Sequence, residues 1–341
     1  MIISVALCTF NGERYIGEQL QSIFAQTELP LEIVICDDGS TDRTLSIIED
    51  MSPSPVDLRI HRNSKNLHFA ANFFKAASLC RGDYILFCDQ DDIWEPTKVA
   101  RIHDLLGREQ PDLIIHQARK LDEKSGIIEQ APVPPMHRDL SDPDLHTVIG
   151  SYALGCCYAV RSGLIAQFPE FWEWDRFSRF REDHGPFVGH DMIIFAHCWG
   201  NGSVRVLNEP LMQYRIHGGN LFGRTEAAGS QSLRDRLAGT LSGQRMMRLG
   251  KLLIAQAELL RQIVAESDFG YSNGLVELEA LMKKRGTALL NRAPIYDQFS
   301  ERINRVEGWY KTLASGSYAL GSEYFGISRF AVLKDLLAAI R

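Results

Sequence analysis

Three carboxylates crowd into four positions of this sequence, at Asp89, Asp91 and Asp92, directly after the apolar run Leu86–Cys88. Carboxylates this close repel one another unless a cation or shared protons neutralise them. Mg²⁺ and Mn²⁺ bind carboxylate oxygens and keep positions open for the phosphate oxygens of a substrate. The acidic cluster, Asp89 to Asp92, therefore predicts a divalent metal site near a phosphate, and the alternative is a solvated acidic turn.

A second acidic pair, Asp37 and Asp38, follows another apolar run and opens into a glycine turn at Gly39. A carboxylate here can accept hydrogen bonds from a pyrimidine N–H or from ribose hydroxyls. The alternative is turn chemistry with a helix N-cap, which explains Gly39, Ser40 and Asp42 well and the two aspartates less well. Nucleotide binding and turn formation both remain open for this motif.

The elements that must position these motifs are short strands alternating with amphipathic helices, the pattern of βαβ units and a parallel sheet. The expected strands are Ile2–Cys8, Glu32–Cys36, Asp57–His61 and Tyr84–Cys88, and the expected helices are Tyr15–Gln26 and Thr41–Met51. Ligands of such sheets bind beyond the carboxyl ends of the strands. Both acidic motifs and Thr9–Gly12 follow strands in this way, so they should share one site.

Two domains are predicted. Residues 1–221 form the catalytic α/β domain, in which the proline-rich stretches Pro132–Pro135 and Ser141–Pro143 indicate a loop or lid. From about Ser232 the apolar spacing becomes helical, so residues 222–341 are expected to form a helical C-terminal module.

Charge separates the same two parts. Residues 222–341 carry a net charge of +5 and residues 1–221 a net charge of −11. An acidic catalytic part argues against a nucleic-acid partner, because phosphate backbones need a basic surface. A metal would still allow acidic residues to hold a small phosphorylated ligand.

Composition indicates a folded globular protein: 45% of the 341 residues are hydrophobic and 23% are charged. Seven scattered cysteines without a Cys-x-x-Cys pair predict neither a disulfide framework nor a thiolate zinc site. The N-terminus lacks the features of a leader, and the chain has no apolar stretch of 18 residues, so we expect a cytoplasmic protein.

Together with the opening segment Val5–Glu13, the two acidic motifs resemble the family 2 glycosyltransferases of the GT-A fold, over residues 1–221. The fold implied is Rossmann-like, with a mostly parallel central sheet flanked by helices. The motif Asp-Gln-Asp-Asp-Ile-Trp resembles that of the rhamnosyltransferase branch of the family, whose members use dTDP-L-rhamnose in polysaccharide assembly. The implied activity is inverting, metal-dependent hexosyl transfer from a nucleotide sugar to a saccharide or lipid-linked acceptor.

The resemblance also implies roles for individual residues. Asp38 and Thr9 would contact the base and Asp89 the ribose, and Lys75 would replace an arginine that the family places near the diphosphate. His68 stands where the family often has a glycine. The implied nucleotide-sugar contacts are Thr9, Asn11, Asp38, Asn66, Lys75, Asp89 and Arg215.

The later motifs would complete the site. Asp191, in Gly-His-Asp, would be the base that takes the acceptor proton, since a carboxylate within reach can do so; the alternative is a capped turn. His217 would join Asp91 as a metal ligand, with Mg²⁺ or Mn²⁺ as the ion, and Arg215 would meet the diphosphate. In isolation, a histidine in a glycine loop is more often a surface residue.

Aromatic residues suggest an acceptor side, because aromatic rings stack on sugar faces. The candidates are Trp94, Trp172 and Trp174, and core packing is the alternative for each.

The basic C-terminal module is compatible with docking at the inner face of a membrane that carries a lipid-linked acceptor. Solvated helices that pack on the catalytic domain, or on a second subunit in a homo-oligomer, are the simpler alternative. Two rival functions also stay open. One is a nucleotidyltransferase, which would want a Gly-rich basic triphosphate loop that Thr9–Arg14 does not provide, and the other is a non-catalytic sugar-nucleotide-binding subunit.

Overall fold

The computed structural model describes residues 1–126, 128–133, 154–166, 168, 189–200, 203–218, 273–296 and 302–314, with short helical pieces between 247 and 261. The chain divides into two compact units. The first contains residues 1–143, 151–184 and 189–224, and the second contains residues 144–150, 185–188 and 225–341. Among the described helices, none has both the length and the apolar character that a membrane crossing requires.

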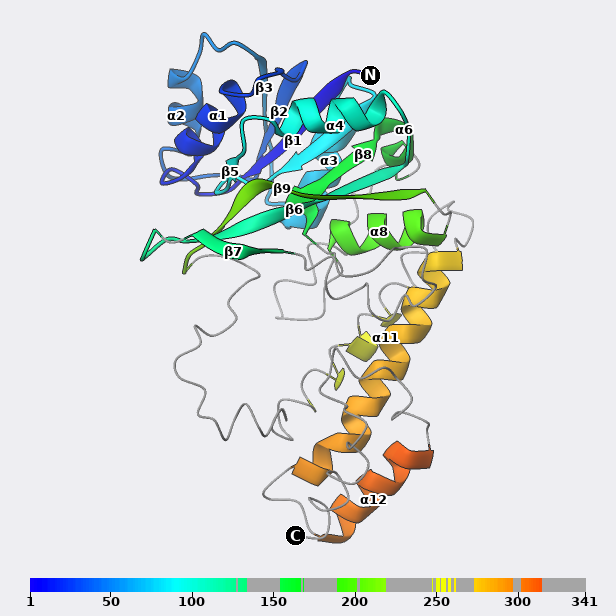
Figure 1. Cartoon of the computed structure of the whole chain (residues 1–341). Helices are drawn as coiled ribbons and strands as arrows, with labels where there is room; N and C mark the ends of the chain where they lie inside the picture. The colour runs from blue at the N-terminus through cyan, green and yellow to red at the C-terminus, as the bar shows by residue number, and fades with distance from the viewer. Residues whose placement is uncertain are drawn as a thin grey trace. The chain divides into compact units, whose positions relative to one another are not determined.

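A nine-stranded mixed sheet forms the centre of the first unit (Figure 1). Its order is β3-β2-β1-β4-β8-β6-β9-β5, and β7 pairs with β6. The first four of these strands are mutually parallel, as predicted, and β8 joins β4 antiparallel. The strands are β1 Ile3–Thr9, β2 Glu32–Asp37, β3 Asp57–Arg62, β4 Tyr84–Cys88, β5 Ile93–Trp94, β6 Leu113–Asp122, β7 Ile128–Val133, β8 Tyr158–Arg161 and β9 Val204–Ile216.

Helices cover both faces of this sheet, and Figure 1 shows α4 in front of it and α3 behind. On β4, Leu86 belongs to the hydrophobic core with residues of α1 and α4, whereas Phe87 points to the other face and packs against Phe73 of α3, with ring centroids 5.5 Å apart. Alternation along the strand thus gives the sheet two apolar faces. The helices are α1 Ile16–Phe24, α2 Thr44–Asp50, α3 His68–Ser78, α4 Lys98–Leu106, α6 Ser162–Ile165 and α8 His190–Gly200.

Two predicted boundaries shift. Helix α2 begins at Thr44, three residues later than expected, and the Asp42 carboxylate accepts its backbone N–H at 3.0 Å. Pro132, predicted in an irregular stretch, lies in β7 opposite Arg119. A proline is tolerated where the strand does not need its N–H. The rest of the predicted loop or lid, residues 134–143, lies outside the described residues.

The described part of the second unit is helical, as predicted for the C-terminal part. It contains α11 Asn273–Arg292, a 3-10 turn at Ala293–Tyr296 and α12 Arg302–Ala314. The helices α11 and α12 approach closely at Gly308, where a Cβ would lie 2.6 Å from the Asn291 carbonyl oxygen. Lys283 and Lys284, two of the basic residues considered for membrane docking, are exposed on α11.

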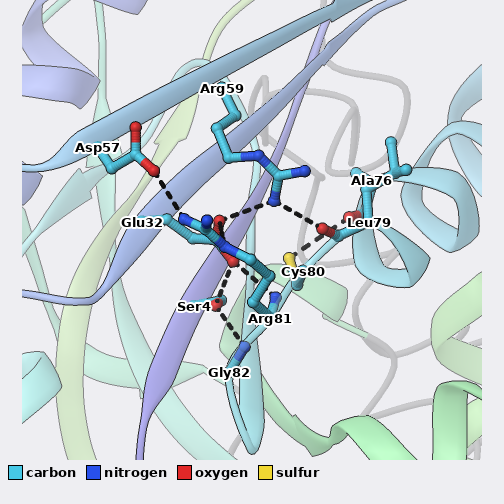
Figure 2. A network of polar contacts seen from close by, with 9 residues as sticks. All are labelled: Ser4, Glu32, Asp57, Arg59, Ala76, Leu79, Cys80, Arg81 and Gly82. Carbon is cyan, nitrogen blue, oxygen red and sulfur yellow. Dashed lines mark hydrogen bonds and ion pairs between the residues drawn. The ribbon is translucent and has the colours of Figure 1, made fainter.

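A buried ion-pair network fastens the edge of the sheet opposite the acidic motifs. Figure 2 shows Glu32, at the start of β2, with Ser4, Arg59 and Arg81 pointing at its carboxylate. The Glu32 side chain is fully buried and pairs with Arg59 at 2.8 Å and Arg81 at 2.9 Å, and it accepts the Ser4 hydroxyl at 2.9 Å. Burial alone would raise its pKa, but these bonds outweigh burial and hold the pKa of Glu32 below its ordinary value.

Replacing this carboxylate tests the network. We expect Glu32→Gln to lower the free energy of unfolding by roughly 2 kcal/mol, the scale of hydrogen bonds to charged groups. The exposed partner of Arg81, Asp57, provides the control, because Asp57→Asn breaks only a surface pair and should cost less than ~1 kcal/mol. Urea denaturation at pH 7 measures both.

The pH dependence has a defined sign. Because the folded-state pKa of Glu32 is lowered, its contribution is complete above the ordinary glutamate pKa of about 4.3 and is lost as pH falls through the folded-state value. The stability difference between the wild type and Glu32→Gln should therefore shrink on acidification. A constant difference down to acid pH would contradict this account.

Candidate active site

The carboxyl ends of three adjacent strands bring the predicted motifs together. Strand β1 lies between β2 and β4, with Thr9 opposite Asp37 and Leu7 opposite Cys88. The residues that follow these strands therefore share one edge of the sheet, as expected for the ligand edge of an open α/β sheet.

Asp37 serves the turn. Its carboxylate accepts the Thr9 hydroxyl at 3.0 Å, the Ser40 hydroxyl at 2.5 Å and the N–H groups of Gly39 and Ser40 at 3.1 and 2.9 Å. Gly39 has φ +87°, a conformation that glycine adopts without strain. Thr9 is only 2% exposed and its hydroxyl donates to Asp37, so Thr9 shapes this loop.

Asp38 links the β2 loop to the start of α3. Its carboxylate accepts the N–H groups of Leu67 and His68 at 2.7 and 2.8 Å and the Asn63 amide at 2.9 Å. The Asn66 amide donates to the Asp38 carbonyl oxygen at 3.1 Å, so these two predicted nucleotide contacts do lie together. His68 has φ +64°, which explains why a glycine would be favoured at this position.

Lys75 belongs to the same part of the site. Its ammonium donates to Asn63 Oδ1 at 2.7 Å, and Asn63 also binds Asp38. This network follows β2 and β3, whereas the acidic cluster follows β4, on the other side of β1. The position fits a contact near Asp38 better than the predicted replacement of an arginine at the diphosphate.

Two amides hold the loop after β1. The Asn11 side-chain oxygen accepts the Thr41 N–H at 2.9 Å, and the Asn11 backbone N–H donates to the Ser40 hydroxyl at 2.9 Å, so this residue serves loop structure. Gln90 accepts the Phe10 N–H at 2.9 Å and donates to the Phe10 carbonyl at 3.1 Å. Gln90 thereby ties the acidic cluster to the loop after β1.

The two predicted metal ligands meet although 126 residues separate them. His217 Nε2 lies 2.8 Å from Asp91 Oδ2, and both side chains are largely buried. The antiparallel pairing of β5 with β9, in which Ile93 lies opposite Gln213, brings the end of β9 beside the acidic cluster. The carboxylate oxygen suits Mg²⁺ or Mn²⁺, and the imidazole nitrogen suits a transition metal such as Mn²⁺ better than Mg²⁺, so this donor set fits Mn²⁺ best of the two expected ions.

Arg215 adjoins this pair. Its Nε donates to the Asp91 carbonyl oxygen at 2.8 Å, its backbone N–H donates to Asp92 at 3.0 Å, and its guanidinium pairs with Glu18 at 2.5 Å. The predicted diphosphate contact is thus beside the predicted metal ligands.

Tyr15, Glu18 and Glu123 support these groups and were not identified from the sequence. The Tyr15 ring lies 4.7 Å from the His217 ring, and the guanidinium of Arg215 lies 5.3 Å from the Tyr15 centroid. The Tyr15 hydroxyl donates to Glu123 at 2.7 Å. These contacts span up to 197 positions, so only the strand order could have revealed them.

The acidic cluster is electrostatically unfavourable by itself. Burial and the neighbouring Asp91 carboxylate raise the pKa of Asp89 to about 7. Asp92 is 1% exposed, and this burial, together with the charge of Asp91, raises the pKa of Asp92 well above its ordinary value. A bound cation would relieve this repulsion.

A second group of ligand atoms lies next to this pair. One ligand atom each from Asp89, Asp92 and Cys156 lies within 4.8 Å of the others. This group includes the Cys156 thiol, and a thiolate suits softer ions such as Zn²⁺. The Asp91 and His217 pair is therefore the better match to Mg²⁺ or Mn²⁺.

Asp191 lies in the first turn of α8 and is near Asp89, whose pKa it helps to raise. Burial raises the pKa of Asp191 to about 6, against the opposing effect of N–H groups that include those of Met192, at 2.8 Å, and Gly155. A carboxylate with this pKa is mostly ionised at pH 7 and still basic enough to accept a proton. Its chemistry fits the predicted base.

Trp94 does not fit its predicted role. It is 2% exposed, belongs to the hydrophobic core, and lies under the Lys98 ammonium, which is 3.8 Å from the ring centroid. A sugar cannot stack on this ring, so the expectation is wrong for Trp94 and core packing applies. Trp172 and Trp174 lie outside the described residues.

Comparison with known proteins supports the family predicted from the motifs. Residues 4–164 match the model of "Glycosyl transferase family 2". The chain is 28% identical over 241 residues to an uncharacterized glycosyltransferase of Nostoc, covering 70% of this chain and 72% of the relative. It is 29% identical over 231 residues to the dTDP-rhamnosyl transferase RfbG of Shigella flexneri, covering 64% and 73% of the two chains.

Solved structures share the fold at low identity. TarS residues 1–349 from S. aureus, in complex with UDP, match with a TM-score of 0.51 at 16% identity over 94% of this chain and 91% of TarS. The mannosyltransferase PcManGT from Pyrobaculum calidifontis, in complex with GDP-Man and Mn²⁺, matches with a TM-score of 0.51 at 15% identity over 99% and 85% of the two chains. With the GT-A fold shared and both sequence comparisons naming glycosyltransferases, this chain is similar to the members of glycosyltransferase family 2, whose model matches its residues 4–164.

Proposed function

We propose that the protein is an inverting, metal-dependent transferase that moves L-rhamnose from dTDP-L-rhamnose to a saccharide or lipid-linked acceptor. Metal dependence is inferred mainly from one observation: His217 and Arg215 both contact Asp91. Asp89, which is near Asp191, belongs to the same acidic cluster. The donor is inferred from the wording of the acidic motif and from the relative named as a dTDP-rhamnosyl transferase. A family 2 glycosyltransferase also fits these observations better than a nucleotidyltransferase or a non-catalytic binding subunit.

In the proposed mechanism, Asp38 and Asn66 lie at the base end, Asp89 contacts the ribose and Arg215 holds the diphosphate. Mg²⁺ or Mn²⁺, when bound by Asp91 and His217, supplies positive charge that stabilises the departing nucleoside diphosphate. Asp191 accepts the proton of the acceptor hydroxyl as that oxygen attacks the anomeric carbon. A single displacement of this kind inverts the anomeric configuration.

Donor identity is tested by thermal shift, since a ligand that binds the folded state raises the melting temperature. With Mn²⁺ present, we expect dTDP-L-rhamnose to give a larger shift than UDP- or GDP-sugars at equal concentration. A larger shift with a UDP- or GDP-sugar would contradict the rhamnosyl proposal while leaving glycosyl transfer intact.

The metal role is tested at Asp91 and His217. We expect Asp91→Ala and His217→Ala to weaken Mn²⁺ binding at least tenfold in calorimetric titrations, because even the residues that support metal ligands contribute 10–100-fold in affinity. His103→Ala is the matched control, since His103 pairs with Glu28 at the protein surface. Unchanged Mn²⁺ affinity in both ligand variants would show that the ion binds elsewhere.

The base is tested by pH and by substitution. Because burial raises the pKa of Asp191 to about 6, we expect kcat/KM to fall about tenfold for each unit below pH 6. Asp191→Asn should lower kcat by about 10²–10⁴-fold, the usual contribution of a general base, while the donor-induced thermal shift persists. Near-normal transfer by Asp191→Asn with donor bound would remove Asp191 from this role.

A further inference from the structure

A three-residue 3-10 turn, Gly155–Cys157, touches both sides of the candidate reaction centre. Ligand atoms of Cys156 and Asp89 lie within 4.8 Å of each other, and Gly155 faces the ring of His190, the residue before Asp191. The buried ammonium of Lys98 donates to the Cys156 carbonyl oxygen at 3.1 Å and holds the turn in place. One short segment thus connects the residue proposed for the ribose with the residue proposed as base.

Gly155 has no room for a side chain. A Cβ at this position would lie 2.3 Å from His190 Nε2 and 3.0 Å from His190 Cε1, closer than real Cβ atoms approach other atoms. The ring cannot easily move aside. His190 is 4% exposed, stacks on Phe73 at 4.3 Å and meets Phe87 edge-on at 5.2 Å.

His190 begins α8 and directly precedes Asp191. The contact of the His190 ring with Gly155 therefore limits the position of the first turn of α8, and with it the position of the Asp191 carboxylate. Burial lowers the pKa of His190 to about 3, so the ring is neutral and acts here as a packing group.

We propose that the Gly155–Cys157 turn is a positioning element, in which Gly155 fixes His190 and thereby aims Asp191 at the acceptor hydroxyl beside Asp89. This inference rests on the proposed role of Asp191 as base. Gly155 itself contacts no substrate in this scheme. Misplacement of a catalytic group by about 1 Å can cost 10²-fold in rate, so a single methyl group at Gly155 should be felt in kcat.

The test compares the kinetics of Gly155→Ala with those of Gly163→Ala. The substrate is the dTDP-, UDP- or GDP-sugar that gives the largest thermal shift with Mn²⁺. The readout is release of the nucleoside diphosphate. Gly163, in α6, is the matched control because a Cβ there meets nothing within 4 Å. We expect Gly155→Ala to lower kcat at least tenfold, with the donor KM and the donor-induced thermal shift within twofold of wild type. The Gly163→Ala variant should stay within twofold in all three.

A second substitution tests the stated cause. Adding His190→Ala to Gly155→Ala removes the clash and should restore at least part of the lost kcat, whereas a general packing defect would make the double variant worse. Wild-type kcat in Gly155→Ala, or a further loss in the double variant, overturns the inference. If Asp191→Asn nevertheless abolishes transfer, the proposed function stands without this positioning element.

The Cys156 contact gives a test that does not depend on the folding of Gly155→Ala. Cys156→Ser keeps a polar group next to Asp89 and should keep kcat within threefold of wild type, while Cys156→Ala should lower kcat by a larger factor at an unchanged melting temperature. Equal rates in these two variants overturn the proposed link between the turn and Asp89.

Discussion

Mutual repulsion among buried carboxylates is the constraint around which this site is built. Asp89, Asp91 and Asp92 leave one strand within four positions, and burial makes each additional negative charge more costly. Neighbouring groups offset part of this repulsion, because the backbone N–H of Arg215 donates to Asp92 and His217 Nε2 lies 2.8 Å from Asp91 Oδ2. A divalent cation at the cluster would offset the negative charge that remains.

The sheet, more than any single motif, decides which groups reach the cluster. Strand β9 pairs antiparallel with β5, which follows Asp92 directly, so the end of β9 carries Arg215 and His217 to the acidic residues. The same strand runs parallel to β6, with Asp122 opposite Ile216, and this register brings Glu123 to Tyr15. A one-residue slip of β9 would turn these side chains to the other face of the sheet.

Sequence reasoning located the strands β1 to β4 within one residue at each end. The strands β1, β2 and β4 are buried, mostly apolar runs that end in turn residues, whereas β3 is a partly exposed strand with alternating polar residues. It also named Asp91 and His217, which the structure places 2.8 Å apart. Residue type and spacing did not separate Asp37 from Asp38, and only the family resemblance singled out Asp38. In the structure Asp37 fills the turn with four hydrogen bonds, and Asp38 joins α3. Both are aspartates after an apolar strand, and only their hydrogen-bond partners distinguish them.

For Trp94, sequence reasoning predicted a function where the structure shows core packing. An aromatic residue beside a metal motif suggests sugar stacking, but the Trp94 ring is buried and lies against the Lys98 ammonium. The support from Tyr15 and Glu123 was invisible for a different reason, because it depends on strand order across more than 100 residues.

The most direct test of the central claim is pulsed electron paramagnetic resonance of Mn²⁺ bound to the full chain in the presence of a nucleotide sugar. If Asp91 and His217 hold the ion, the echo modulation contains the ¹⁴N coupling of one imidazole, and that coupling disappears in His217→Ala. Bound Mn²⁺ that shows no ¹⁴N coupling, or one that survives in His217→Ala, would contradict the account.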